Sequence, residues 1–497
     1  MRYPKSVGLR RCDKIMRDKP IVLWFRNDLR IGDHAALVAA VRTGAPILPL
    51  YILDDASPKQ WKMGGASRWW LDQSLAALSG DLAGRGSPLV LRRGDSEKEL
   101  LRIIEETGAA SVYFTRSYEP WAVALEHRLK TKLDEANVAF RRFGGRLLRE
   151  PEDMRTSNGA FYKVYTPFSR AIMKDLVPAK SVRAPERIAA FEKQPKSERL
   201  RDWELHPQKP DWSKGLASAW QPGEAGARKR LSDFVRTALK SYARDRNYPA
   251  TPGTSRLSPH LAFGEISPGA CWQAVAHAGG KTNGSDNSVE TFLKELLWRE
   301  FSAGLLFHFP ELPEEPFRPE FAAFPWHKNA KHLKAWQTGQ TGYPIVDAGM
   351  RELWATGYMH NRVRMIAASF LIKHLLIPWQ TGEAWFWDTL VDADLANNSA
   401  NWQWVAGSGA DAAPYFRIFN PVLQGEKFDP DGDYVRRWVP ELAKLPRQII
   451  HAPWKGDSGT LMEACVKLGK SYPNPIVEHG EARARALAGY EHTKNSH

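Results

Sequence analysis

The first third of the chain alternates short apolar runs with longer stretches in which apolar residues recur every three or four positions. Five of the short runs are rich in β-branched and aromatic residues, which is typical of strands: IVLWF (21–25), ILPLYIL (47–53), LVL (89–91), SVYF (111–114) and VAFRRF (138–143). Strands that alternate with helices predict an α/β domain with a doubly wound, parallel five-stranded sheet over residues 20–148. No G-x-G-x-x-G follows the first strand, so the dinucleotide fingerprint of Rossmann domains is absent.

The pattern changes further along the chain. Residues 149–225 contain proline- and lysine-rich pieces such as PAKSVRAP and HPQKPDW with weak periodicity, and we expect an interdomain linker there. From residue 226 to 497 long helical patterns follow one another without convincing strands, which predicts an all-α second domain. Residues 1–19 are basic but lack the apolar core of a secretory signal, so we expect a flexible tail.

Composition narrows the class of protein. With 43% hydrophobic and 25% charged residues and no run of about twenty apolar residues, the chain is expected to be soluble and without a membrane span. Three widely spaced cysteines, Cys12, Cys271 and Cys465, exclude a disulfide framework and a four-thiolate metal site, and they fit a reducing cytoplasm. The net charge of +14 suggests a polyanionic partner, although a generally basic soluble protein explains it as well.

Tryptophan is abundant in the second half of the chain. Of 20 tryptophans, 11 lie between Trp298 and Trp454. Buried tryptophans are usually core residues, so their density alone decides nothing. Basic side chains are interleaved with them, however, and that combination is typical of surfaces that bind nucleic acids or flat cofactors.

Two segments carry candidate binding residues. In TPGTSRLSPHLAFGEISP (251–268), Thr254, Ser255 and Ser258 surround a turn before a helix, which indicates either a phosphate cradle or a plain helix cap. In ETFLKELLWREF (290–301), Glu295 and Trp298 share a helix face. A carboxylate beside an indole in a mostly apolar helix needs a partner, unless the helix is simply amphipathic with Glu295 at the surface.

Two further segments combine polar and soft side chains. Asn361, Arg364 and Met365 lie on one face where an apolar helix begins, which is typical of a lined pocket rather than of a core. Residues 388–438 place two carboxylates before a stretch of small and polar residues, followed by two indoles. The side chains of interest there are Asp392, Asp394, Asn398, Trp402 and Trp404.

These segments resemble the photolyase/cryptochrome family, and specifically its bacterial cyclobutane pyrimidine dimer photolyases. The resemblance extends from VLWFRNDLRIGDHAAL (22–37) through YKVYTPF (162–168) to YPNPIVEHGEARARALAGYE (472–491), which is nearly the whole chain. SERLRDWELHPQKPDW and the linker around it are most similar to the class III branch, which is close to plant cryptochromes.

The resemblance implies a U-shaped FAD in the helical domain, active in its reduced form. Its phosphates and ribityl chain are then expected to be bound by Tyr242, Thr254, Ser255, Leu257, Ser258 and Arg299. Its isoalloxazine ring is expected to be surrounded by Asn361, Arg364, Asp392, Asp394 and Asn398, with Glu295 close by. Arg364 and Asp392 should form a buried ion pair, and the uncharged Asn398 near the ring N5 should favour reduced flavin.

The implied function is light-driven repair of pyrimidine dimers in double-stranded DNA, by an electron from excited reduced FAD to the flipped-out dimer. The residues implied for the lesion are Glu295, Trp298, Asn361, Met365 and Trp404. Those implied for DNA phosphates are Arg246, Arg362 and Arg417, and those for electron transfer from the surface to the flavin are Trp402, Trp379 and Trp326. A methenyltetrahydrofolate antenna is expected in the N-terminal domain, and no metal.

Three other functions are weighed against this one. A (6-4) photolyase would use histidines where Asn361 and Met365 stand, and a DASH-type enzyme tends to carry Gln and Tyr in place of Met365 and Trp404. A cryptochrome photoreceptor without repair activity shares the fold and the flavin, but the lesion residues and Asn398 favour repair.

Phe292 replaces a tryptophan of some relatives, and a second electron branch through Trp385 and Trp387 stays open. We expect a monomer in the bacterial cytoplasm, associated with the nucleoid when DNA is bound.

Overall fold

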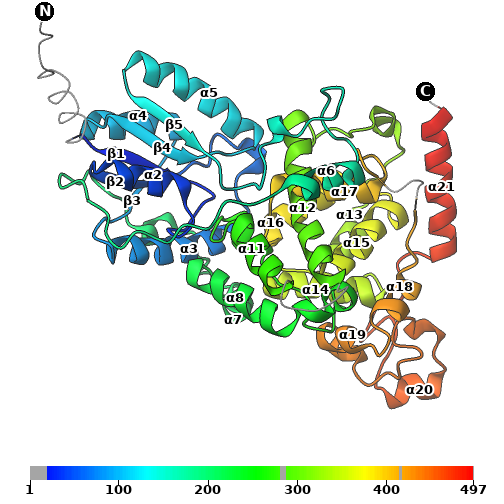
Figure 1. Cartoon of the computed structure of the whole chain (residues 1–497). Helices are drawn as coiled ribbons and strands as arrows, with labels where there is room; N and C mark the ends of the chain where they lie inside the picture. The colour runs from blue at the N-terminus through cyan, green and yellow to red at the C-terminus, as the bar shows by residue number, and fades with distance from the viewer. Residues whose placement is uncertain (1–18, 280–286, 413–416, 496–497) are drawn as a thin grey trace, which may run out of the picture.

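The computed structural model describes residues 19–279, 287–412 and 417–495, and it contains an α/β domain beside a helical domain (Figure 1). The predicted tail, residues 1–19, lies outside the described residues except for Lys19. The α/β domain consists of β1 (Ile21–Phe25), α2 (Ala35–Thr43), β2 (Ile47–Leu53), α3 (Gly65–Ala83), β3 (Val90–Arg93), α4 (Ser96–Thr107), β4 (Ser111–Thr115), α5 (Pro120–Glu135) and β5 (Ala139–Phe143). All five strands are those that the apolar runs predict.

The five strands form one parallel sheet in the order β3-β2-β1-β4-β5, with Ile21 opposite Ile47 on one side and Ser111 on the other. Alternate residues of β1 belong to different cores. Leu23 packs with α2 and α3 on one face, and Val22 packs with α4 and α5 on the other. Burial on both faces is why β1 and β2 read as continuous apolar runs rather than as alternating ones, whereas the edge strand β5 is largely exposed.

The helical domain is confirmed, because every strand that the structure describes belongs to the N-terminal sheet. Its helices are α6 (Tyr165–Asp175), α7 (Lys214–Ala219), α8 (Glu224–Thr237), α9 (Tyr242–Asp245), α10 (Ser258–Ala262), α11 (Pro268–Gly279), α12 (Asn287–His308), α13 (Ala330–Gln337), α14 (Pro344–Thr356), α15 (Asn361–Ser369), α16 (Trp379–Thr389), α17 (Leu395–Ala406), α18 (Pro421–Phe428), α19 (Asp433–Trp438), α20 (Ser458–Glu463) and α21 (His479–Asn495). Among the described helices, none is long and apolar enough to cross a bilayer.

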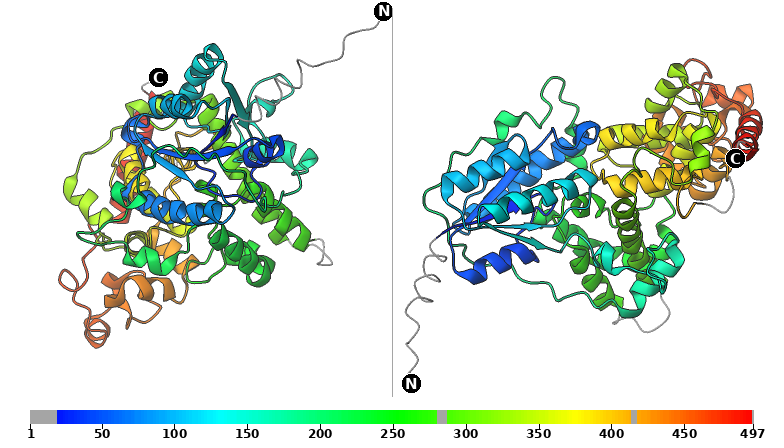
Figure 2. Two further views of the ribbon diagram at one scale, coloured as in Figure 1. Left: turned by 90° about the vertical axis from the view of Figure 1, so that its left-hand side faces the viewer. Right: turned by 90° about the horizontal axis from the view of Figure 1, so that it is seen from above.

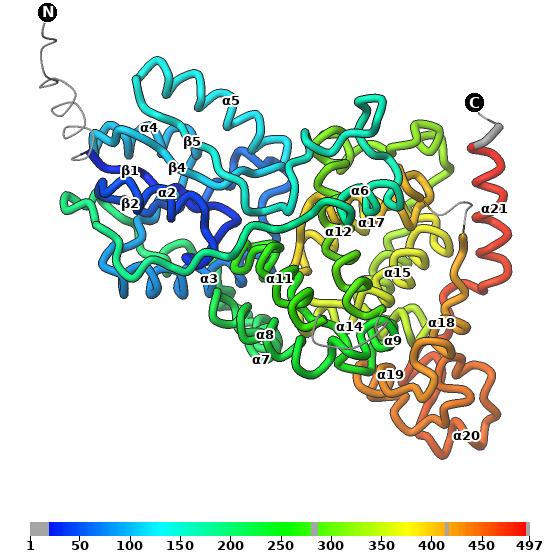
Figure 3. Tube along the Cα trace, in the orientation of Figure 1, coloured from blue at the N-terminus to red at the C-terminus, as the bar shows by residue number. Residues whose placement is uncertain are grey.

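Residues 149–225, predicted as a linker, pack against both domains. The helix α6 buries Tyr165, Phe168 and Ile172 in the same core as α8, α11 and α12. The chain then returns to the α/β domain, where Ala190 forms a parallel bridge with Ile47 of β2 (Figure 3). Two further views show the domains side by side, with the sheet and α21 at opposite ends of the molecule (Figure 2).

Two buried carboxylates of the helical domain bind donors of the α/β domain. Glu265 is completely buried and accepts hydrogen bonds from Trp70 Nε1 of α3 at 3.0 Å and from the backbone N–H of Gly223 at 2.7 Å, beside His260. Glu224 accepts from the backbone N–H groups of Ile31 at 2.8 Å and of Gly32 at 3.1 Å. These bonds fix the angle between the domains because buried donors must stay paired.

Replacing Glu265 by alanine is expected to lower the free energy of unfolding by about 3 kcal/mol, because its buried partners lose their acceptor. Urea denaturation of the purified variant measures this. Glu135→Ala, at an exposed site on α5, is the control and should change stability by less than about 0.5 kcal/mol. Equal stability of the two variants would contradict the role given to Glu265.

Candidate active site

A cavity of about 490 Å³ lies inside the helical domain between α12, α15 and α17, and we call it the central pocket. It brings together side chains that are up to about 160 positions apart in the sequence. Seventeen of the predicted site residues line it: Tyr242, Arg246, Ser255, Leu257, Ser258, Glu295, Trp298, Arg299, Asn361, Arg362, Arg364, Met365, Asp392, Asp394, Asn398, Trp402 and Trp404.

Four predicted site residues lie elsewhere. Thr254 lines a neighbouring cavity instead of the central pocket. Trp379 is buried in the helical core, and Trp326 packs half-buried against the same core. Arg417 is exposed on the segment that precedes α18. The two tryptophans are therefore part of the helical core, and their role in electron transfer stays a prediction.

The Arg364 side chain crosses from α15 to the segment before α17. Its guanidinium donates to both carboxylate oxygens of Asp392, at 2.8 and 3.1 Å, and its Nε donates to the carbonyl of Met359 at 2.7 Å. Burial opposes the charge of Arg364, but the facing carboxylate of Asp392 outweighs it and raises the pKa of Arg364. The ion pair expected from the sequence is therefore present, and the bonds of Nη2 to Asp392 and of Nε to Met359 together fix the Arg364 side chain.

The start of α17 is fixed by its own cap. Asp394 accepts from the backbone N–H of Asn397 at 2.9 Å and from its side-chain amide at 2.8 Å. One turn further, Asn398 donates from Nδ2 to the carbonyl of Glu383 on α16 at 3.0 Å. Burial raises the pKa of Glu383 well above its usual value, and Ser399 donates a hydrogen bond to its carboxyl group. The carboxylate of Asp394 and the uncharged amide of Asn398 therefore lie side by side in this part of the wall, with Glu383 behind them.

The sequence left open whether Glu295 has a partner or lies at the surface, and the structure gives it one. Arg246 Nη1 lies 2.6 Å from Glu295 Oε1, and both side chains are about one-quarter to one-third exposed. Trp298, one turn along α12, stacks flat on Tyr165 of α6 with ring centroids 3.6 Å apart. Carboxylate and indole therefore occupy fixed positions at the pocket wall.

Positive charge gathers beside Glu295. Arg362 donates to Asn247 Oδ1 at 2.6 Å and lies 4.3 Å from the ring centre of Phe428. Burial and the positive charge of Arg246 lower the pKa of Arg362. Two guanidinium groups that repel each other at one pocket favour an anionic ligand.

The predicted electron-transfer residue Trp402 is closely packed. Its ring lies 5.0 Å from Phe386 and 6.3 Å from Trp336, centre to centre. It lines the central pocket, yet its Nε1 is buried and has no hydrogen-bond partner among the described residues. An orphan donor of this kind fits a pocket whose ligand supplies an acceptor.

The two tryptophans of the open second branch each stack on another indole. Trp385 lies parallel to Trp354 with ring centres 6.1 Å apart, and Trp387 meets Trp61 edge-on at 5.7 Å. Among the ring contacts of the described residues, none links either pair to Trp402, so the second electron branch stays a prediction.

Sequence reasoning missed a second cavity, which we call the sheet-edge cavity. It has a volume of about 150 Å³ and lies where β1, β2 and β4 end, with Glu119, Arg146, Trp24 and Trp61 in its wall. The available signal was the position of these residues just after parallel strands, where α/β folds bind ligands. It shares Asp394, Ala393 and Ala262 with the central pocket.

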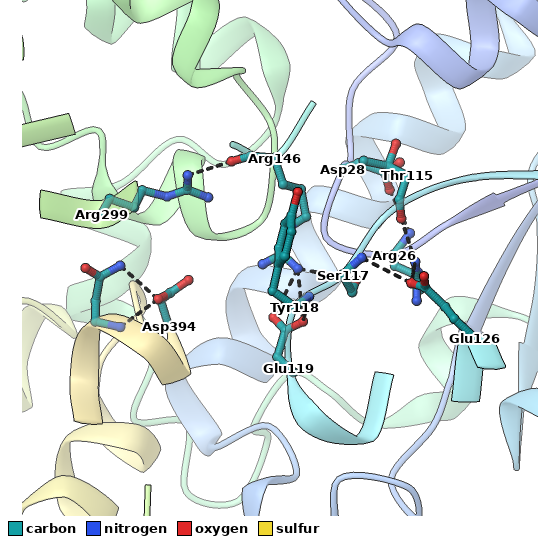
Figure 4. A network of polar contacts seen from close by, with 11 residues as sticks. Arg26, Asp28, Thr115, Ser117, Tyr118, Glu119, Glu126, Arg146, Arg299 and Asp394 are labelled. Atoms are coloured by element: carbon teal, nitrogen blue, oxygen red, sulfur yellow. Dashed lines mark hydrogen bonds and ion pairs between the residues drawn. The ribbon is translucent and has the colours of Figure 1, made fainter. Parts of the chain in front are cut away.

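A polar network joins the two cavities (Figure 4). Arg299 donates to the carbonyl of Arg146 at 2.6 Å, and the guanidinium of Arg146 pairs with Glu119 at 3.0 Å. Arg146 is buried, and its pKa is raised because the facing Glu119 and Asp394 outweigh the cost of burial. Arg299 is thus held by the α/β domain while it lines the central pocket. Among the described residues no group of side chains could hold a metal ion.

Comparisons with known proteins agree with this arrangement. A model of the DNA photolyase family matches residues 21–186, and a model of the FAD binding domain of DNA photolyase matches residues 292–492. The chain is 53% identical to the deoxyribodipyrimidine photo-lyase of Agrobacterium fabrum over 97% of this chain and 99% of that protein. It is 38% identical to cryptochrome-1 of Arabidopsis thaliana over 93% of this chain and 69% of that protein.

A solved structure is similar throughout. The crystal structure of a bacterial class III photolyase from Agrobacterium tumefaciens superimposes with a TM-score of 0.93 at 54% identity, covering 96% of this chain and 98% of that one. The chain is therefore similar to a class III photolyase in fold as well as in sequence.

Gly382 of α16 sets the position of Trp402. A Cβ added there would lie 2.2 Å from Cη2 of Trp402 and 2.6 Å from Cδ2 of Leu371, so Gly382→Ala must displace the indole. We expect a loss of about 1–3 kcal/mol in the free energy of unfolding, measured by urea denaturation. Gly304→Ala on α12, where nothing lies within 4 Å of the added Cβ, should be neutral or stabilising. A stable Gly382→Ala would contradict the tight packing.

Proposed function

This chain belongs to the DNA photolyase family, and we propose that it repairs cyclobutane pyrimidine dimers in DNA with the energy of light. It is an enzyme of the deoxyribodipyrimidine photo-lyase class, a carbon–carbon lyase. The observation that carries the proposal is the central pocket, where Glu295 and two indoles, Trp298 and Trp404, line the same cavity as the Arg364–Asp392 pair. One cavity thus combines a surface for flat bases with a site for a flat cofactor.

The helical domain binds FAD. The residues of the central pocket fit this cofactor, since Trp402 contributes an unpaired buried donor and the walls combine apolar side chains with hydroxyl, amide and charged groups. When bound in its reduced form and excited by light, FAD supplies the electron that opens the cyclobutane ring and takes it back afterwards. No residue of the chain needs to act as a nucleophile.

We assign the flavin contacts by position in the pocket. Tyr242, Leu257, the hydroxyls of Ser255 and Ser258, and Arg299 would hold the phosphates and ribityl chain, with Thr254 behind them. Asn361, Asp394 and the Arg364–Asp392 pair would surround the isoalloxazine. Asn398 offers the ring an uncharged amide, which is consistent with an enzyme that works with reduced flavin.

The lesion would bind at the mouth of the same pocket. Trp298 and Trp404 form its aromatic surface, and stacking of this kind contributes about 1–3 kcal/mol per base. Glu295 and Asn361 would hydrogen-bond the pyrimidine edges, with Met365 packed against the dimer. Arg246 pairs with Oε1 of Glu295 and aligns the carboxylate, whose oxygens can accept hydrogen bonds from the bases. The dimer must leave the base stack to reach these groups.

DNA backbone phosphates would bind the basic residues around the mouth. Arg246 and Arg362 line the pocket, and Arg417 is exposed on the nearby segment before α18. Each contact of this kind releases counterions, so binding should weaken steeply with salt. Trp402, Trp379 and Trp326 would carry electrons from the surface to the flavin.

The sheet-edge cavity is our candidate for the antenna, a methenyltetrahydrofolate. Its walls combine aromatic residues such as Trp24, Trp61 and Trp387 with polar groups including Arg146 and Asp54, which suits a flat, partly charged molecule. We also propose that the protein acts as a monomer in the bacterial cytoplasm and associates with the nucleoid when it binds DNA.

The repair activity is tested with photoreduced or dithionite-reduced protein, dimer-containing duplex DNA and blue light, by counting restored thymines. Glu295→Gln should repair about tenfold or more slowly because a charged hydrogen-bond acceptor is lost, while its flavin absorbance stays unchanged. Glu290→Gln, on the same helix but in an exposed pair with Lys294, is the control and should repair normally. No light-dependent restoration by the wild type would leave the cryptochrome-type photoreceptor as the function.

Trp402→Phe is expected to slow light-driven reduction of oxidised flavin, because an indole next to the pocket is replaced by a ring that is harder to oxidise. Absorbance under blue light with an external thiol follows this reaction. Repair by chemically reduced protein should be spared, and Trp438→Phe should behave like the wild type. Unchanged photoreduction in Trp402→Phe would remove this residue from the electron path.

A further inference from the structure

A third cavity, of about 580 Å³, opens to solvent beside the central pocket and shares Ser255 and Tyr358 with it. Its walls come from α8, from residues 249–256, from the residues after α14 and from Arg437 of α19, and we call it the α8 cavity. Apart from Thr254 and Ser255, which we assign to the flavin, the proposed repair reaction uses none of the residues in these walls.

Three arginines of the α8 cavity have no acceptor. Among the hydrogen bonds and ion pairs of the described residues, none involves the guanidinium groups of Arg230, Arg256 or Arg437, and Nε of Arg256 is buried without a partner. Other cations of α8 are paired. Arg228 binds Glu224, and Arg236 lies 2.8 Å from Asp233. The unpaired arginines are thus those that face the cavity.

Two of these arginines are held against one indole. The guanidinium carbon of Arg256 lies 4.2 Å from the ring centre of Trp220, and that of Arg230 lies 5.5 Å from the same ring. Burial and the positive charge of Arg256 lower the pKa of Arg230. Arg256 also has a φ of 50°, which is uncommon for a residue with a side chain. The fold therefore holds two like charges together, an arrangement that a bound anion relieves.

The carboxylates in the wall of the α8 cavity are engaged elsewhere. Asp233 pairs with Lys229 at 2.6 Å as well as with Arg236. Glu352 accepts from the Tyr434 hydroxyl at 2.6 Å, and burial raises its pKa. His360 is neutral because burial, with nearby cations, lowers its pKa to about 3. Asp233 and Glu352 act on Arg230 and Arg256 only through space, and neither forms a hydrogen bond or an ion pair with these guanidinium groups, which can therefore still bind a ligand.

We infer that the α8 cavity binds a phosphate group between Arg230 and Arg256, in addition to the phosphates of FAD in the central pocket. Planar guanidinium groups match the oxygens of a phosphate, and Thr251, a residue with a hydroxyl group, lines the same cavity. The ligand is a phosphate ester or anhydride, and its source is either a free nucleotide or the DNA backbone beside the lesion.

Calorimetric titration of the FAD-loaded protein with sodium pyrophosphate tests this site. Arg230→Gln and Arg256→Gln should each weaken binding about tenfold or more, because each removes a charge-assisted contact. Arg236→Gln is the matched control on α8 and should bind like the wild type, since Arg236 does not line the cavity and its guanidinium is already paired with Asp233. The flavin absorbance of all three variants should stay at the wild-type level.

Equal pyrophosphate affinity in all variants, no binding to the wild type, or loss of FAD from Arg230→Gln would each overturn the inference; in the last case the arginines belong to the flavin site. Absence of light-dependent repair by the wild type, with pyrophosphate binding intact, would instead contradict the proposed function and leave this inference standing. The source of the phosphate follows from DNA binding measured over a salt series. If DNA displaces pyrophosphate and Arg230→Gln reduces the salt slope by about one, the ligand is the backbone. Pyrophosphate binding that DNA leaves unchanged assigns the site to a free phosphate ester.

Discussion

The pairing of Arg364 with Asp392 is the interaction on which the central pocket depends. It joins α15, which carries Asn361 and Met365, to the segment whose next carboxylate, Asp394, caps α17. The helix α17 in turn carries Asn398 and the two indoles of the site. A salt bridge in a wall of this kind is costly to bury, and removing one partner leaves an unpaired charge. Its presence is therefore better explained by the geometry that it imposes on two helices than by stability.

Much of the fold could be predicted, because the signals that determine it are local. The apolar run 47–53 has the bounds of β2, and the continuous rather than alternating pattern follows from burial on both faces. The helix start at Asn361 and the cap at Asp394 are also local signals. Helices whose packing partners lie far away in the sequence are harder to predict. The helix α6 is an example, because it falls within the predicted linker and packs against α8, α11 and α12.

The chemistry of the site could be predicted only in part from the sequence. Residue types and the family resemblance identified the residues that the central pocket gathers, but not their partners. Arg246 and Glu295 are 49 positions apart, and no pattern along the chain couples them. The unpaired state of Arg230 is likewise invisible in sequence, since on α8 it looks like any other cation of an amphipathic helix. Such properties depend on which carboxylates the folded chain brings near.

Trp298 rests on Tyr165, and this contact has a consequence for the modular architecture of the protein. Tyr165 comes from α6, which lies about sixty residues before the start of the predicted helical domain at residue 226. The structural unit that surrounds the pocket therefore includes a segment that a domain boundary drawn from the sequence leaves out. A fragment that begins at residue 226 would keep every residue that lines the central pocket yet lose Tyr165, on which the indole of Trp298 stacks. Exchange of domains between relatives would therefore have to carry α6 together with α12.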